Sequence, residues 1–487
     1  MSGEVERQAA ACLLASFPGP RAPEWILRWV ESGLGGIVLF AGNLEDREQV
    51  AGLTATLRAE RADLVIAIDE EGGDVTRLEA ATGSSYPGNL ALGFVDDVEL
   101  TRAVAGAIAG DLVEAGVTLN LAPVADVNSN PQNPVIGVRS FGSEPELVAR
   151  HVTAFVAATQ ARGVAACAKH FPGHGDTSVD SHLGLPVVEV EREELLAGPL
   201  VPFRAAVEAG VAAVMTAHLV VPALEGIPAT VSEVVVGDLL RGELGFGGTV
   251  ISDALDMNAV STTIGVDETA VRAISAGVDA LCLGPTIDAH GVESIHRALM
   301  ARVPEERLAE AADNGRRLGR SAGHVRGQTP DIAEAAVAEV GADAARRALL
   351  ISGDVTLDEP PLVIELAPEP LVAAGPATFG LGRAIVERRA EATVFAVHEP
   401  PSDAGAVLRS AKARPLVLVL RDAARHPWQQ SAANDLIDLR PDAVVVETGL
   451  PAWLPPGASA SVATHGAGRV NLEAAADVIV GPVRPPL

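Results

Sequence analysis

The chain reads, from residue 169 to residue 182, Lys169-His170-Phe171-Pro172-Gly173-His174-Gly175-Asp176-Thr177-Ser178-Val179-Asp180-Ser181-His182. An apolar run at 164–167 leads into this stretch and predicts a buried strand. Pro172, Gly173 and Gly175 then interrupt both strand and helix, so the polar side chains lie on a loop. Loops at strand ends commonly carry the chemistry of a protein, and this one holds three of the chain's eleven histidines.

Apolar runs of strand length recur on both sides of this stretch. Strands are predicted at 36–40, 64–69, 118–123, 164–170, 211–218, 249–253 and 279–283. Helices are predicted at 4–14, 23–32, 46–60, 98–115, 144–161 and 193–209. Apolar strands that alternate with helices indicate a parallel sheet covered on both faces. Seven such units, with an eighth too degenerate to recognise, within about 250 residues favour a TIM-type (β/α)8 barrel over an open sheet.

Polar residues stand at the carboxyl ends of five of these runs: Asp69, Asp126, Lys169 with His170, His218, and Asp253. The carboxyl ends of barrel strands meet on one face, and barrel enzymes build their active sites there. We therefore expect these side chains to form one ring. His218, as a member of this ring, is expected to bind substrate.

The chain continues beyond the predicted barrel, which is assigned to 1–325. A polar, Gly-containing linker and an Ala-rich helix are predicted at 326–348, and a smaller α/β sandwich domain at 349–487. Its strands are predicted at 349–352, 361–365, 393–397, 415–421 and 442–447, and a closing helix at 471–480. No Gly-x-Gly-x-x-Gly follows a strand and there is no P-loop, so no cofactor is expected. Gly466-Ala467-Gly468 precedes the closing helix and is either a plain turn or a site for an anion.

Composition excludes several classes of partner. The net charge is 36 − 64 = −28, so the surface repels phosphate backbones and anionic membranes, and neither nucleic acid nor membrane is expected as a partner. Three scattered cysteines, Cys12, Cys167 and Cys282, are interpreted as buried free thiols. The acidic N-terminus does not look like a signal peptide, so a cytoplasmic location is expected.

Asp253 and Lys169 are the strongest single candidates for chemistry. Asp253 ends an apolar strand, where a carboxylate suits a nucleophile or a stabiliser of a cationic transition state. A helix cap is the alternative role for Asp253, and for Asp256 three residues later a cap is the commoner role. Of 36 basic residues only Lys169 and Lys412 are lysines, so Lys169 indicates a need for a compact ammonium with three donors rather than a solvated surface cation.

Asp180 and His182 are two residues apart on the polar loop. In an extended segment they point the same way and can hydrogen-bond, which fixes the imidazole tautomer and makes an acid/base pair near neutral pH. A metal site formed by His170, His174, Asp176 and His182 is the competing interpretation. The spacing is not that of one helical face, and Phe-Pro-Gly separates the first two histidines, so no metal is expected. His174 and Asp176 are expected to bond the loop itself.

Asp69, Arg77 and Arg139 complete the candidates, together with Lys169 and His170. A carboxylate that accepts from two hydroxyls, with arginine and lysine donating to neighbouring oxygens, is a way to hold a polar, uncharged ring such as a sugar. Each of these residues taken alone could equally belong to a surface ion pair.

These motifs together resemble those of the glycoside hydrolase family 3 β-N-acetylglucosaminidases, from about residue 35 to residue 284, with a second domain behind them as in the two-domain members. The signature of that group is Lys169 to Thr177 followed by Asp180-Ser181-His182. The resemblance implies that Asp253 is the catalytic nucleophile and that His182, oriented by Asp180, is the acid/base. It also implies that Asp69, Arg77, Arg139, Lys169 and His170 bind the terminal sugar.

One residue departs from the family's pattern. Many relatives have a basic residue after the Gly-Gly pair, whereas Asp74 follows Gly72-Gly73 here. The outer charge of the sugar pocket is therefore left open, although Asp69 and Arg77 keep the family's spacing.

The resemblance thus implies an exo-acting, retaining β-N-acetylglucosaminidase, and we expect a monomer or homodimer that acts on a small amino-sugar glycoside. The resemblance implies peptidoglycan fragments as substrates, and the residues do not choose among muropeptides, chitobiose and aryl glycosides. One alternative is a phosphorylase that uses phosphate as acceptor and forms GlcNAc-1-phosphate. An inactive sugar-binding protein is another, and it predicts loss of Asp253, Asp180 or His182, all of which are present.

Overall fold

The computed structural model describes residues 3–321, 334–368, 372, 373, 375, 379–399 and 414–483. Contacts within the chain define two compact units. The first comprises Met1–Glu71, Thr101–Ile136 and Gly142–Ile332, and the second comprises Gly72–Leu100, Gly137–Phe141 and Ala333–Leu487. Of the predicted linker and helix at 326–348, the part before residue 334 lies outside the described residues, and α13 (Glu334–Arg347) forms most of the rest.

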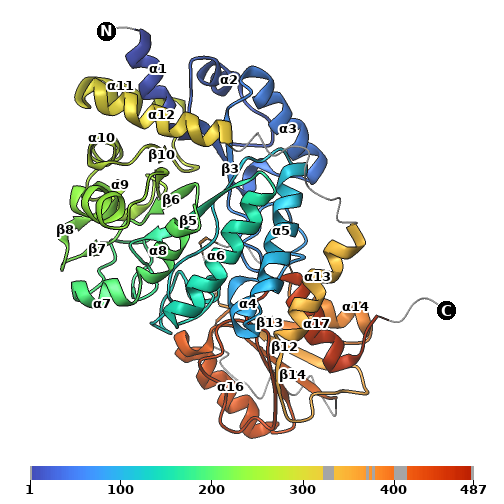
Figure 1. The fold of residues 1–487 in the computed structure, drawn as a ribbon. Helices are drawn as coiled ribbons and strands as arrows, with labels where there is room; N and C mark the ends of the chain where they lie inside the picture. Colours follow the sequence, from blue (N-terminus) through green and yellow to red (C-terminus); the bar gives the residue numbers. More distant parts are fainter. Residues whose placement is uncertain are drawn as a thin grey trace. The chain divides into compact units, whose positions relative to one another are not determined.

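Eight parallel strands close into a barrel in the first unit (Figure 1). In order around the barrel they are β1 (Leu13–Ala15), β2 (Gly36–Leu39), β3 (Val65–Ile68), β4 (Leu119–Asn120), β5 (Ala165–Phe171), β6 (Ala213–Thr216), β9 (Thr249–Ser252) and β10 (Ala280–Cys282). Pairing of β10 with β1 closes the ring. The predicted fold class, a TIM-type (β/α)8 barrel followed by a smaller α/β domain, is confirmed.

The barrel strand that could not be recognised in the sequence is β1. The helix predicted at 4–14 ends earlier, as α1 (Gly3–Ala11), and the next residues form β1 by pairing with β2 and β10. The alanines and leucines of this segment suit a helix as well as a strand, and three residues are too few to display a period of two. Partners distant in the sequence therefore decide the conformation of Leu13–Ala15.

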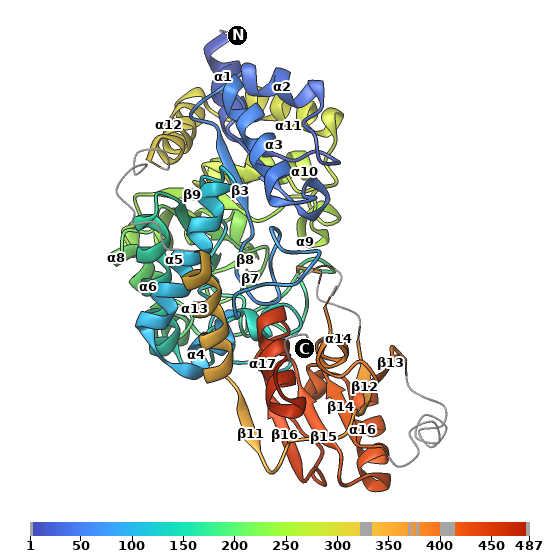
Figure 2. The same ribbon diagram turned by 90° about the vertical axis from the view of Figure 1, so that its right-hand side faces the viewer.

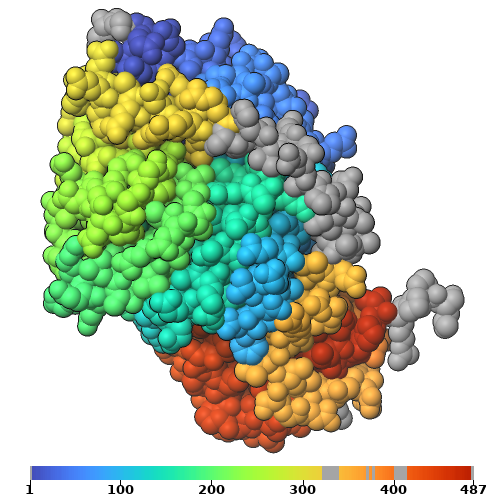
Figure 3. Space-filling view, viewed as in Figure 1, coloured from blue at the N-terminus to red at the C-terminus, as the bar shows by residue number. Residues whose placement is uncertain are grey.

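Helices surround the barrel between its strands. They are α2 (Glu24–Glu31), α3 (Arg47–Glu60), α5 (Val98–Glu114), α6 (Pro145–Ala161), α7 (Arg192–Ala197), α8 (Val201–Glu208), η4 (Val234–Glu243), α10 (Val266–Ala276), α11 (Ala289–Arg302) and α12 (Glu305–Ser321). The single helix predicted at 193–209 is two helices, α7 and α8, because Gly198 and Pro199 interrupt it. The N-terminal α1 packs against α11 and α12, the dark blue and yellow surfaces at the top of Figure 3.

The barrel interior is a layer of small and medium apolar side chains. Each strand contributes to it, and Leu318 of α12 packs against it; the members include Leu14, Val38, Val65, Ala67, Leu119, Ala165, Cys167, Ala213, Met215, Ile251, Ala280 and Cys282. Cys12, Cys167 and Cys282 are buried and free, as predicted. No helix in the described part of the chain combines the length and apolar character needed to cross a membrane.

A buried polar cluster lies where β10 begins, at the amino end of the barrel strands. Asp279 is fully buried and accepts four hydrogen bonds. Arg241 and Arg307 donate to it at 2.6 and 2.8 Å, the Asn314 amide at 2.9 Å, and the backbone N of Val250 at 2.9 Å. This carboxylate connects β9, β10, η4 and α12, so we expect it to contribute to stability.

The second unit is built on a six-stranded sheet (Figure 2). Its order is β11 (Leu350–Ser352), β16 (Ala460–Ala463), β15 (Val444–Glu447), β14 (Leu416–Leu420), β12 (Leu362–Leu366) and β13 (Thr393–Val397). β11 is antiparallel to β16, and the other pairs are parallel. Sequence reasoning missed β16, a short run of small residues.

Helices cover both faces of this sheet and make it a three-layer sandwich. The helices α14 (Leu381–Arg388) and α17 (Arg469–Val480) pack on one face, against side chains such as Val363, Val417 and Val446. The helix α16 (Pro427–Leu439) packs on the other, against Ile364, Leu418 and Val445. The alternation of these side chains along each strand puts apolar residues on both faces.

Asp74, the residue that departs from the family's pattern, lies inside the second unit. Its carboxylate pairs with Arg421 and accepts a hydrogen bond from the backbone N of Ala467 at 2.8 Å. Ala467 stands in the Gly466–Gly468 turn before α17. The turn that the sequence left open as an anion site is therefore bound by a carboxylate of the protein itself.

Candidate active site

Lys169 and His170 occupy an irregular part of β5. The strand pairs with β6 through Ala168 and then through Phe171, so the regular register is lost between them. Irregularities of this kind re-aim side chains and are frequent beside active sites. Lys169 reaches the end of β3, and His170 reaches the segment after β4, as the next contacts show.

The ammonium of Lys169 is buried between two carboxylates. Its Nζ lies 2.6 Å from Asp69 Oδ1 and 2.7 Å from Glu71 Oε1, and the lysine is 2% exposed. The structure thus brings together Asp69 and Lys169, two of the predicted sugar-binding residues. The side chain of Glu71 is as buried as the lysine, whereas that of Asp69 is 17% exposed, so Asp69 is the carboxylate of this group that a ligand can reach.

Glu71 is a member of this group that the sequence analysis missed. A signal was present, since Asp69-Glu70-Glu71 puts three acids at the end of a buried strand, in a chain with a single lysine before residue 412. A buried ammonium requires carboxylate partners. We infer that Glu71 offsets the buried charge of Lys169 and holds it against Asp69.

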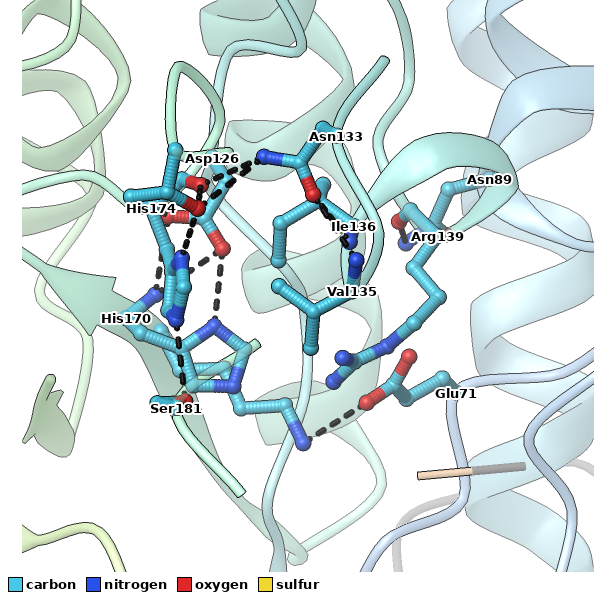
Figure 4. Close-up of polar contacts among 12 residues, drawn as sticks. Glu71, Asn89, Asp126, Asn133, Val135, Ile136, Arg139, His170, His174 and Ser181 are labelled. Atoms are coloured by element: carbon cyan, nitrogen blue, oxygen red, sulfur yellow. Dashed lines mark hydrogen bonds and ion pairs between the residues drawn. The ribbon is translucent and has the colours of Figure 1, made fainter. Parts of the chain in front are cut away.

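Asp126 is a fully buried acceptor for two of the loop's histidines (Figure 4). The Nδ1 of His170 lies 2.7 Å from Asp126 Oδ2, and the backbone N of His174 donates to Oδ1 at 2.7 Å. A carboxylate accepts, so Nδ1 of His170 carries the proton. Asp126 therefore fixes the tautomer of His170, as a carboxylate does for a functional imidazole.

His174 is buried at the centre of the polar loop. Its ring contacts Thr177 Oγ1 at 2.7 Å and Ser181 Oγ at 3.0 Å, and its carbonyl accepts from Asn133 Nδ2 at 2.8 Å. Burial lowers the pKa of His174 to about 4, so the ring is neutral at pH 7. His174 bonds the loop itself, as expected from the sequence.

Asp180 and His182 form the predicted hydrogen-bonded pair. The Nδ1 of His182 and its backbone N lie 2.7 and 2.9 Å from Asp180 Oδ1. Burial would raise the pKa of Asp180, but the hydrogen bond and the charge of His182 outweigh it and lower that pKa. Because Nδ1 donates to this carboxylate, any acid/base chemistry of this ring takes place at Nε2.

Asp253 follows β9 directly and is partly buried. Its Oδ1 accepts from the backbone N of Ala254 at 2.8 Å. Burial by itself would raise the pKa of Asp253, but His170, His218 and His182 outweigh it and lower the pKa below its ordinary value. Asp253 is therefore an ionised carboxylate with three histidines around it.

His218 and Asp256 have partners that the sequence did not indicate. His218 is fully buried, with Nε2 3.1 Å from the Ala254 carbonyl and Nδ1 2.8 Å from Thr230 Oγ1. Both ring nitrogens bond to the protein, and one holds the residue next to Asp253. Asp256 does not cap α9 (Asn258–Ser261); its carboxylate accepts from Thr286 N and Oγ1 at 3.0 and 2.7 Å.

Arg77 and Arg139, the remaining predicted sugar-binding residues, belong to the second unit. The guanidinium of Arg77 donates to the carbonyl of Ala373 at 2.7 Å. Arg139 is buried, and its carbonyl accepts from Asn89 Nδ2 at 2.7 Å. Their role in binding a sugar stays a prediction.

The four residues of the metal interpretation each bond to protein partners. His170, His174 and His182 do so as described above, and Asp176 accepts from Ser129 Oγ at 3.0 Å. In the part of the chain that the structure describes, no three His, Cys, Asp or Glu side chains are grouped so that they could hold a metal ion.

Comparison with known proteins places this barrel and its polar rim in a family. Residues 22–316 match the model of the glycosyl hydrolase family 3 N-terminal domain. β-Hexosaminidase A of Pseudoalteromonas piscicida is 38% identical over 302 residues, which cover 57% of this chain and 50% of that protein. The chain thus spans about half the length of that relative.

Solved structures extend the likeness to the second unit. A family 3 β-N-acetylglucosaminidase from Paenibacillus sp. str. FPU-7 is 34% identical, with a TM-score of 0.87 over 98% of this chain and 97% of that one. NagZ from Neisseria gonorrhoeae in complex with N-trifluoroacetyl-D-glucosamine is 30% identical, with a TM-score of 0.56 over 68% of this chain and 97% of that one. The chain belongs to glycosyl hydrolase family 3, as the resemblance in its motifs predicts, and glycoside hydrolase is the class of enzyme shared by these relatives.

Proposed function

We propose that the protein is an exo-acting, retaining β-N-acetylglucosaminidase with Asp253 as nucleophile and His182, oriented by Asp180, as acid/base. The observation that carries the proposal is the 2.7 Å bond between His182 Nδ1 and Asp180, on the loop after β5 of the barrel whose strand β9 leads directly into Asp253. Two relatives are named for this activity, a β-hexosaminidase and a β-N-acetylglucosaminidase.

The first chemical step forms a glycosyl-enzyme. Protonated His182 donates from Nε2 to the glycosidic oxygen, while a carboxylate oxygen of Asp253 attacks the anomeric carbon and the aglycone leaves as an alcohol. Asp180 stabilises the imidazolium before the transfer. A lowered pKa suits Asp253, because an ionised carboxylate is the attacking form and stabilises positive charge on the sugar ring; burial opposes this lowering, and the nearby histidines produce it.

The second step returns Asp253 to its free form. The neutral imidazole of His182 takes a proton from water as the water oxygen attacks the anomeric carbon, and the bond to Asp253 breaks. Two displacements at one carbon retain its configuration. Acid and nucleophile lie about 5 Å apart in most retaining enzymes, and a histidine on a loop reaches that distance when substrate binds.

The terminal sugar binds, in this proposal, at the carboxyl ends of the barrel strands, beside Asp253. Asp69 accepts from sugar hydroxyls, and Lys169, held by Asp69 and Glu71, supports that carboxylate and donates to neighbouring oxygens. His170, whose ring is oriented by Asp126, offers its other ring nitrogen to the sugar. The complex of NagZ from N. gonorrhoeae with N-trifluoroacetyl-D-glucosamine supports an amino sugar as the bound unit.

Only the family resemblance bears on the natural aglycone. On that basis we propose peptidoglycan fragments as the natural substrates. Chitobiose and aryl glycosides present the same terminal sugar, so the proposal extends to them. The cytoplasmic location expected from the sequence stays a prediction, as does a monomeric or homodimeric state.

Phosphate is the alternative acceptor in the second step. A neutral imidazole does not repel a phosphate dianion as a carboxylate acid/base would, so this second candidate rests on His182 itself. Turnover of an aryl β-N-acetylglucosaminide with and without millimolar phosphate, followed by NMR, tests both. We expect free β-GlcNAc to appear first at a rate that phosphate does not change. Accumulation of GlcNAc-1-phosphate would identify a phosphorylase, and no turnover would favour a sugar-binding protein.

A further inference from the structure

Ser181 lies between the two members of the acid/base pair, Asp180 and His182. We propose that Ser181, through its hydrogen bond to His174, is a positioning residue that sets where His182 presents its Nε2 atom; this inference rests on the proposed function. Nothing in the sequence by itself indicates a role for Ser181. Three independent observations support this positioning role.

The first observation is a chain of hydrogen bonds with one consistent set of proton positions. The hydroxyl of Thr177 donates its one proton to the His174 carbonyl at 3.0 Å, so His174 Nδ1, at 2.7 Å, donates to that hydroxyl. The neutral ring then accepts at Nε2 from the Ser181 hydroxyl, at 3.0 Å. Each donated proton in this series of hydrogen bonds has an acceptor, which favours a single orientation of the Ser181 hydroxyl.

The second observation concerns the backbone of Ser181. Its carbonyl accepts from the backbone N of Ala259 at 3.2 Å. Ala259 lies in α9, in the segment that follows Asp253. Ser181 thus connects the acid/base pair both to the loop after β5, through His174, and to the segment that carries the proposed nucleophile.

The third observation is the exposure of the residues around the pair. Val179 is 43% exposed and Leu183 is 71% exposed, whereas Ser181 is 1% exposed. Apolar burial therefore does not hold this part of the loop. The buried anchor is a polar one, so its loss frees the segment from 180 to 182 without opening an apolar core.

The test compares Ser181→Ala with Ser178→Ala. Ser178 is an exposed serine of the same loop whose hydroxyl accepts a 3.4 Å bond from Asn130, so it is a matched control. Each variant is assayed on an aryl glycoside with a good leaving group and on a GlcNAc-containing disaccharide with a poor one. We expect Ser181→Ala to lower kcat/KM on the disaccharide at least about tenfold, and kcat/KM on the aryl glycoside less than about threefold. The ratio kcat/KM reports the step that forms the glycosyl-enzyme, in which only the poor leaving group needs the aligned acid.

Two further readouts separate positioning from general stability. KM for the disaccharide is expected to stay at the wild-type value, because Ser181 does not bind the sugar. Ser181→Thr keeps the hydroxyl and is expected to retain the wild-type ratio of the two rates. Amide hydrogen exchange in the segment 178–184 is expected to be faster in Ser181→Ala than in Ser178→Ala.

The inference fails if Ser181→Ala loses kcat/KM equally on both substrates, or matches Ser178→Ala. His182→Ala in the same series distinguishes this failure from failure of the proposed function. If His182→Ala loses activity selectively on the disaccharide and Ser181→Ala does not, the positioning role alone is wrong. If His182→Ala shows no such selectivity, the acid/base assignment is wrong and the role of Ser181 falls with it.

Discussion

Asp279, which is fully buried, and Asp253, which is partly buried, lie at opposite ends of the neighbouring barrel strands β10 and β9. They differ in the side chains that surround their carboxylates. Asp279, where β10 begins, is fully buried and accepts four hydrogen bonds, two of them from arginines. Asp253, at the carboxyl end of β9, accepts from the adjacent backbone N of Ala254 and has histidines nearby in place of arginines.

The difference shows how the neighbouring side chains suit one carboxylate to a role in stability and another to a role in catalysis. Arginine is permanently charged and binds a carboxylate in fixed geometry, so a carboxylate between two arginines is held in place. Histidine changes charge near neutral pH and holds a carboxylate less rigidly, so a carboxylate among histidines can attack a substrate, as proposed for Asp253. We expect loss of the Asp253 carboxylate to affect turnover and loss of the Asp279 carboxylate to affect stability.

The largest expected effect is the loss of turnover in Asp253→Ala. Removal of the nucleophile is expected to lower kcat at least about 10⁴-fold, with the midpoint of unfolding close to that of the wild type. Asp256→Ala is the matched control, because its carboxylate binds Thr286 in a neighbouring loop, and it should retain most of the activity. Wild-type-like turnover by Asp253→Ala would contradict the assignment.

His182→Ala is expected to have the next largest effect, and one that depends on the leaving group. Loss of a general acid costs about 10²- to 10⁴-fold where the leaving group needs a proton, and far less for an activated aryl glycoside. The slope of log(kcat/KM) against leaving-group pKa measures this and should become steeper. Equal losses across the series would argue against His182 as the acid.

Asp279→Asn is expected to affect stability rather than turnover. The substitution leaves Arg241 and Arg307 without their shared counter-charge, which costs about 3–5 kcal/mol in the free energy of unfolding. Asp313→Asn is the control, since that exposed carboxylate pairs with Arg316 on the surface of α12 and should cost less than about 1 kcal/mol. Denaturant unfolding measures both, and kcat per folded molecule should stay at the wild-type value.

The smallest effect is a dependence of stability on pH. The unfolded chain protonates His174 below about pH 6.5, whereas burial keeps the folded ring neutral down to about pH 4. The unfolded state thus binds more protons in this window, so stability is present above pH 6.5 and falls as pH decreases towards 4. For His174 alone we expect a loss of roughly 2 kcal/mol between pH 7 and pH 5. Urea unfolding at the two pH values checks this, and His174→Gln should show a smaller difference.

The sequence was sufficient for the barrel because most of its strands are apolar runs bounded by helices. It was insufficient for Leu13–Ala15 and Ala460–Ala463, where a few residues of mixed propensity become strands through partners far along the chain. The prediction of one helix at 193–209 is wrong for a local reason, since Gly198 and Pro199 separate α7 from α8.

The candidate site shows the same division. Asp180 with His182 could be predicted from their spacing, and Asp69 and Lys169 could be expected on one face because each stands at the end of a predicted strand. The supporting contacts could not, since no strand end or motif marks their partners: Asn133 lies 41 positions before His174, and Arg77 lies 296 positions before Ala373. A sequence shows which side chains are unusual, but not which others touch them.

The pairing of Asp74 with Arg421 and Ala467 bears on how proteins of this architecture can be recombined. The second unit takes two of its three segments, Gly72–Leu100 and Gly137–Phe141, from before the linker. A chimera that exchanges only the chain after residue 333 with a relative would therefore bring an unmatched partner to Asp74. Inheritance of the chain after residue 333 and of the segment 72–100 is expected to be linked, so that substitutions in one restrict those tolerated in the other.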